Sequence, residues 1–100
     1  MISFIEFNNI SAIGSEAKIS VDGVGAVSYT IPAGKKGVSF QNVGSKIAWY
    51  GGDNVSPADS IGVKLFVNQT LSFKNVKNTF KIYFKCAVAD TTSIGVVNYD

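Results

Sequence analysis

The chain has 100 residues, of which 46% are apolar and 16% are charged, and its net charge is +2. This length suits one domain with one core, and a composition so apolar and so poor in charge excludes an intrinsically disordered chain. The small net charge weighs against a nucleic-acid partner, and so does the absence of arginine, the side chain best suited to phosphate and guanine.

The N-terminal part of the chain has two interpretations. Residues 1–16 are predicted to form an N-terminal arm or edge strand with a linker, and residues 17–100 are predicted to form a β-sandwich domain. In one interpretation the arm exchanges between subunits, with Phe4 and Phe7 as interface residues; in the other it is an ordinary edge strand followed by a loop. Residues 1–7 lack the basic start and small-residue cleavage site of a signal peptide. No apolar run reaches the roughly 18 residues of a membrane span. We therefore expect a protein that is made in the cytoplasm and is either kept there or assembled there into something larger, with no membrane partner.

Alternation of apolar and polar residues recurs along most of the chain, whereas helical periodicity is nearly absent. The longest example is residues 80–88, in which apolar side chains alternate with Lys81, Tyr83 and Lys85. Turn signals such as Asp22-Gly23 separate these runs. The predicted strands are residues 2–7, 17–21, 25–31, 37–42, 46–50, 62–67, 70–74, 79–88 and 92–98. About eight or nine short strands without helices predict an all-β fold, either an antiparallel β-sandwich or a small barrel.

The sequence offers little for catalysis or metal binding. It contains no histidine, so neither a Ser-His-Asp nor a Cys-His arrangement can form. The single cysteine, Cys86, lies in the apolar phase of a strand, where a buried thiol behaves as a small hydrophobe. Asp53, Asn54 and Asp59 could offer oxygen ligands to calcium, but their spacing does not match an EF-hand loop. We therefore predict no catalytic residue, no metal site and no cofactor.

Aromatic side chains on the outside of the sheets are the remaining candidates for a functional surface. In the strand at residues 46–50, Trp49 is predicted to point inward and Tyr50 outward, since tyrosine keeps its hydroxyl in water. Tyr83 lies in the outward phase between Lys81 and Lys85. Aromatic rings beside long aliphatic stems are typical of subunit interfaces and of sugar-binding platforms. An isolated outward tyrosine is also common, because tyrosine has a high strand propensity.

Three segments in the middle of the chain carry a family resemblance. They are Ile-Pro-Ala-Gly at residues 31–34, Val-Ser-Phe-Gln-Asn-Val-Gly-Ser at 38–45 and Ile-Ala-Trp-Tyr-Gly-Gly-Asp-Asn-Val at 47–55. These segments and the residues after them contain, in order, an Asn-x-Gly-Ser turn, a strand ending in Gly-Gly, a polar loop, Gly-x-x-Leu and a final aromatic hairpin. This pattern resembles small β-domains of bacteriophage virion proteins, found in head fibres, capsid decoration proteins and tail-associated proteins. It covers about residues 25–98; residues 1–24 match nothing in it, and Val67-Asn68-Gln69-Thr70 replaces the usual Pro-Gly turn.

The resemblance implies a structural component of a bacteriophage virion that acts through protein–protein contacts. Its partners would be copies of itself, as a homo-oligomer, and other virion proteins, after synthesis in the host cytoplasm. A surface so poor in charge also favours coverage by partner subunits. The alternative is a carbohydrate-binding module that recognises a host surface glycan through Tyr50, Tyr83 and the loop at residues 53–60. No functional residue is carried over from the resemblance, because such modules act through whole surfaces.

Overall fold

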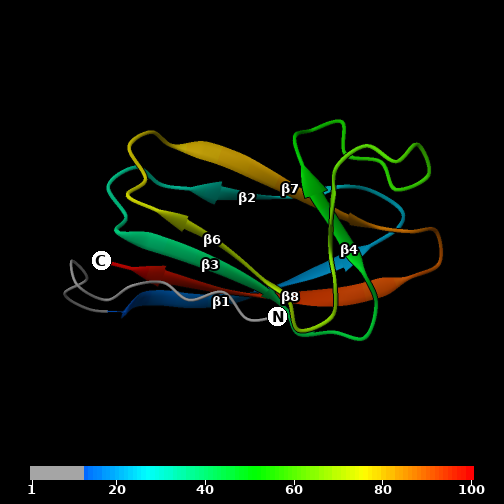
Figure 1. Cartoon of the computed structure of the whole chain (residues 1–100), viewed down its shortest axis with the longest axis horizontal. Coiled ribbons are helices and arrows are strands. Elements are labelled where there is room, and N and C mark those ends of the chain that lie inside the picture. The colour runs from blue at the N-terminus through cyan, green and yellow to red at the C-terminus, as the bar shows by residue number, and fades with distance from the viewer. Residues whose placement is uncertain (1–12) are drawn as a thin grey trace.

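The computed structural model describes residues 13–100, which form eight strands and no helix. The strands are β1 (Ile13–Asp22), β2 (Val27–Ile31), β3 (Gly37–Asn42), β4 (Ala48–Gly51), β5 (Val63–Leu65), β6 (Thr70–Lys74), β7 (Phe80–Cys86) and β8 (Thr91–Tyr99). They make two four-stranded antiparallel sheets, ordered β1-β8-β3-β6 and β2-β7-β4-β5. Figure 1 shows β2 and β7 of one sheet above β1 and β8 of the other. The all-β prediction is confirmed, in its sandwich form.

The strand pairing is that of one long hairpin rolled up on itself. Strand β4 pairs with β5, β3 with β6, β2 with β7 and β1 with β8, so each pair encloses the previous one in the sequence. Rolling this hairpin brings β3 against β8 and β4 against β7, which completes the two sheets. A rolled hairpin of eight strands in two sheets is the jelly-roll arrangement.

The core lies between the sheets and is centred on aromatic rings. Phe40 on β3 is fully buried, and its ring centroid lies 5.5 Å from that of Tyr29, 5.4 Å from that of Phe84 and 6.1 Å from that of Phe73. Edge-to-face and tilted contacts of this kind stabilise an aromatic cluster beyond its burial alone. The other largely buried apolar side chains of the core are Val21, Ile31, Val38, Ala48, Leu65, Val76, Ile82, Cys86, Ile94 and Val96.

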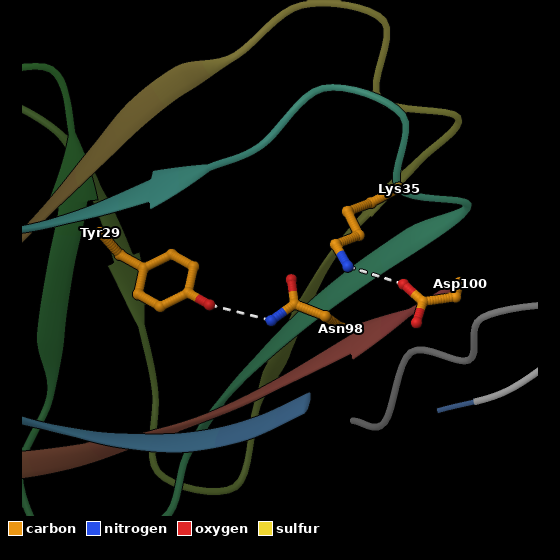
Figure 2. A network of polar contacts seen from close by, with 4 residues as sticks. All are labelled: Tyr29, Lys35, Asn98 and Asp100. Atoms are coloured by element: carbon orange, nitrogen blue, oxygen red, sulfur yellow. Dashed lines mark hydrogen bonds and ion pairs between the residues drawn. The ribbon is translucent and has the colours of Figure 1, made fainter. Parts of the chain in front are cut away.

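Two polar contacts tie the layers together near one end of the sandwich (Figure 2). Asn98 on β8 donates from Nδ2 to the hydroxyl oxygen of Tyr29 on β2, at 2.9 Å, which joins the two sheets. Lys35, in the turn between β2 and β3, forms an ion pair of 2.6 Å with Asp100, directly after β8. The amide of Asn98 and the hydroxyl of Tyr29 therefore give each other a hydrogen-bond partner inside the sandwich.

The buried side chain of Asn42 organises the opposite end. Its Nδ2 donates to the carbonyl oxygens of Lys46 at 2.7 Å and Leu65 at 2.9 Å. Its Oδ1 accepts from the backbone N–H of Gly44 at 3.2 Å and from the hydroxyl of Thr92 at 2.7 Å. One amide thereby fixes the β3–β4 turn against the end of β5 and the start of β8.

The strand boundaries differ from the predicted ones mainly where pairing is non-local. β1 begins at Ile13, so residues 13–16 belong to the first strand rather than to the predicted linker. They are held there by β8, with an irregularity in the register between Ile13 and Ser15. β7 ends at Cys86, and Val88 is 80% exposed in the following turn instead of continuing the apolar face. The predicted strand at residues 2–7 lies outside the described residues.

Candidate functional site

The outer face of the β2-β7-β4-β5 sheet takes its orientation from β7. Ile82, Phe84 and Cys86 are buried, so the alternating residues of the same strand point away from the core. Lys81 and Tyr83 belong to this outward set. The phase predicted from the sequence for the middle of this strand is therefore confirmed.

The predicted orientations of the two aromatic residues on β4 are wrong. Ala48 is fully buried opposite Cys86, and Tyr50, opposite Phe84, packs against the core. Trp49 therefore points outward. The cause is the register with β7, because a residue on one strand shares its face with its cross-strand partner. Tyr50 does not contribute to the outer face, whereas Trp49, which was predicted to point inward, does.

Trp49 lies at the centre of a row of side chains that crosses three strands. Its cross-strand partner on β5 is Lys64 and its partner on β7 is Lys85. The ammonium nitrogen of Lys64 lies 5.5 Å from the Trp49 ring centroid, within the range of a cation–π contact. Tyr83 is opposite Gly51, one step diagonally from Trp49, a spacing that large aromatic side chains can bridge. Trp49, Tyr83 and Lys85 are all half-buried.

We name this surface the aromatic–lysine face. It consists of Trp49, Lys64, Lys81, Tyr83 and Lys85, with Ser28, Thr30 and Gly51 as its small neighbours. The structure brings together three of the residues predicted to form an interface, Lys81, Tyr83 and Lys85. Phe4 and Phe7, also predicted as interface residues, lie outside the described part of the chain.

Sequence reasoning missed Trp49 and Lys64. β4 has only four residues and β5 only three, too few for alternation to identify the buried side. The clue that would have helped is the neighbouring Ala48, whose small side chain fits where β4 crosses the core.

A second surface feature is a polar cleft of about 430 Å³ where β1 ends and β8 begins. The residues that line it include Ser20, Ser45, Thr91 and Ser93, which carry hydroxyls, and Asp22. Asp22 Oδ1 accepts from the backbone N–H groups two and three residues further on, at 2.9 and 3.4 Å. The cleft therefore combines hydroxyl groups with a carboxylate already engaged in its own turn.

Nothing in the described region assembles the ligands of a metal centre. Residues 13–100 contain no group of three or more His, Cys, Asp or Glu side chains placed to hold an ion. Asp59 Oδ2 accepts a hydrogen bond of 2.9 Å from the Ser56 hydroxyl within the β4–β5 loop. This bond is local, as expected for an acidic residue that stabilises its own turn.

The only thiol is not activated as a nucleophile. Burial raises the pKa of Cys86, and the carboxylates of Asp90 and Asp22 raise it further. Its Sγ lies 3.7 Å from the carbonyl oxygen of Val21. A thiol held protonated inside the core is a packing group.

Residues 13–100 include no helix that could cross a membrane. No family model, no curated protein and no solved structure matches this chain.

Proposed function

We propose that the protein is a structural component of a bacteriophage virion, such as a capsid decoration or head-fibre protein, and that it acts through protein–protein contacts made by the aromatic–lysine face. The jelly-roll arrangement supports the proposal, because viral capsid domains commonly use it. Lectin domains use it too, so the surface rather than the fold must distinguish the two functions.

The observation that carries the proposal is the position of Trp49 and Tyr83 on the outer face. Tryptophan and tyrosine are enriched at the centres of protein interfaces, where they supply large contact areas at a small cost in conformational entropy. Lys64 and Lys85 flank Trp49, and their aliphatic stems add apolar area while their ammonium groups stay in water. The result is an apolar centre with a charged rim, which is the usual anatomy of a protein interface.

The test replaces both aromatic residues, Trp49→Ala with Tyr83→Ala, in the gene of a phage that encodes the protein. The control is Val24→Ala, because Val24 is an apolar residue that is 91% exposed in the turn between β1 and β2, outside the aromatic–lysine face. Quantitative mass spectrometry of purified particles counts the incorporated copies. We expect about a tenfold loss for the double variant, as for loss of an interface hot spot, and no loss for Val24→Ala. Absence of the wild-type protein from particles, or equal incorporation of all variants, would refute the proposal.

The second candidate function is recognition of a host surface glycan. The polar cleft favours it, because several hydroxyls and Asp22 line a concavity of about 430 Å³, large enough for a small sugar. The sugar platform expected at Tyr50 would instead be formed by Trp49 and Tyr83, since Tyr50 faces the core. A glycan array tests this function. Specific hits that Ser45→Ala or Trp49→Ala removes would support it, whereas an array without hits would count against it.

A further inference from the structure

We infer that the aromatic–lysine face binds an acidic segment of a different protein, and that it does not pair face to face with a second copy of itself. This inference rests on the proposed function, since it names the chemistry of the partner at the same surface. Its basis is the distribution of charge over the outward residues of one sheet.

The outward positions of the four strands carry only positive charge. Lys64 on β5 and Lys81 and Lys85 on β7 are the charged residues among them, while β2 contributes Ser28 and Thr30. No aspartate or glutamate occupies an outward position on β2, β7, β4 or β5. A face with three ammonium groups and no carboxylate produces a positive potential that attracts acidic partners.

These three charges are not neutralised within the described residues. Between residues 13 and 100, the ion pair found is that of Lys35 with Asp100, at the end of the sandwich. The ammonium group of Lys64 contacts the Trp49 ring instead of a carboxylate. Carboxylates supplied from outside can therefore pair with Lys64, Lys81 and Lys85 without breaking an ion pair of the described residues.

The same charges oppose a symmetric dimer through this face. A two-fold interface places the same patch on both subunits, so three lysines of one copy would meet three lysines of the other. Like charges brought together and removed from water disfavour such a complex. The occupant must therefore present a different, acidic surface.

The spacing of the lysines fits an extended polypeptide. Lys81 and Lys85 are four residues apart on one strand, with Tyr83 between them. Because a strand rises about 3.3 Å per residue, the two ammonium groups leave the sheet roughly 13 Å apart. An extended acidic segment along β7 would place carboxylates opposite both lysines and lay apolar side chains on Tyr83 and Trp49. Lysine suits this pairing as a compact charge, whereas phosphate polymers are usually bound by the planar guanidinium of arginine, which the chain lacks.

Trp49 provides a direct probe of this face, because it is the only tryptophan in the chain. The experiment titrates the full chain with poly-L-glutamate and follows the Trp49 fluorescence. We expect a saturable change that weakens when salt is raised from about 0.05 M to about 0.5 M. The variant Lys64→Glu with Lys85→Glu should bind at least about tenfold more weakly.

The control is Lys36→Glu with Lys77→Glu, which changes the net charge equally but alters exposed lysines in the loops after β2 and β6. It should bind within about threefold of the wild type. If the two double variants lose affinity for poly-L-glutamate equally, binding depends only on the net charge of the protein, and the inference is wrong. Absence of a Trp49 signal, or tighter binding of polygalacturonate than of poly-L-glutamate, would also overturn it, the latter in favour of an acidic glycan.

Incorporation into particles separates this inference from the proposed function. Loss of both the aromatic double variant and the Lys64→Glu/Lys85→Glu variant from virions would support both. If the aromatic variant is lost while the charge-reversed variant is incorporated normally, the acidic partner is wrong and the proposed function stands. If both variants are incorporated to the same extent as the wild type, the proposed function is wrong together with the acidic partner.

Discussion

Asn42 shows how one buried polar residue can hold a loop-rich end of a sandwich in place. All four hydrogen-bonding positions of its amide are used, two as donors and two as acceptors. The side chain is fully buried, so water cannot replace a lost bond. The sequence marks this position only as part of a turn signal. The long-range partners, Leu65 and Thr92, follow from the rolled topology and could not be inferred from local pattern.

Replacing Asn42 with alanine should lower the free energy of unfolding by about 2–4 kcal/mol, because two carbonyl oxygens, one N–H and one hydroxyl lose their partner at a buried site. Gln41→Ala is the control. Gln41 is half-buried and its amide makes one bond of 3.3 Å, to the carbonyl oxygen of Asn68. The Gln41→Ala substitution should lower the free energy of unfolding by less than about 1 kcal/mol. Urea unfolding followed by circular dichroism measures both, and equal effects would show that the amide network contributes little.

The side that a strand buries could be predicted only where the strand was long enough for its alternation to show. β7 has seven residues, and its alternation identified the buried and outward sides of its middle correctly. β4 has four residues with two adjacent aromatic rings, so the sequence did not indicate which ring faces the core. The answer depends on the register of Tyr50 with Phe84, a contact between distant parts of the chain. The candidate face was half predictable for this reason: its β7 residues were found and its β4 and β5 residues were not.

The β3–β4 turn illustrates a second element whose shape depends on a distant strand. A side chain built on Gly44 would collide with the side chain of Thr92 and the backbone nitrogen of Ser93 at the start of β8. We therefore expect Gly44→Ala to destabilise the protein by about 1–3 kcal/mol, as overpacking does. At Gly25, in the β1–β2 turn, an added Cβ meets no atom within 4 Å. Gly25→Ala should change stability by less than about 0.5 kcal/mol. Thermal unfolding of both variants tests the difference, and a neutral Gly44→Ala would contradict the tight turn packing.

At the scale of the whole molecule, most pairing joins residues that are far apart in sequence. Ile13 pairs with Tyr99, and Val27 pairs with Phe84. Folds dominated by such contacts lose much chain entropy before the contacts form, so they fold slowly. We expect refolding from urea to take between about 1 ms and about 1 s in stopped-flow fluorescence of Trp49. Complete refolding within microseconds would contradict the expectation that pairing between distant strands limits the folding rate.

The rolled hairpin also has a consequence for synthesis on the ribosome. β8 lies between β1 and β3, so until Thr91–Tyr99 has left the exit tunnel β1 has no partner among the strands of residues 13–100 and β3 is paired on one side. Domains usually begin to fold from the N-terminus as they are made, but here β1 must wait for β8, from which it is separated by six other strands. β1 and one edge of β3 therefore stay unpaired by β8 until Thr91–Tyr99 has been made. A nascent chain of this design depends on rapid synthesis of β8, or on a chaperone that covers β1 and β3, to avoid aggregation.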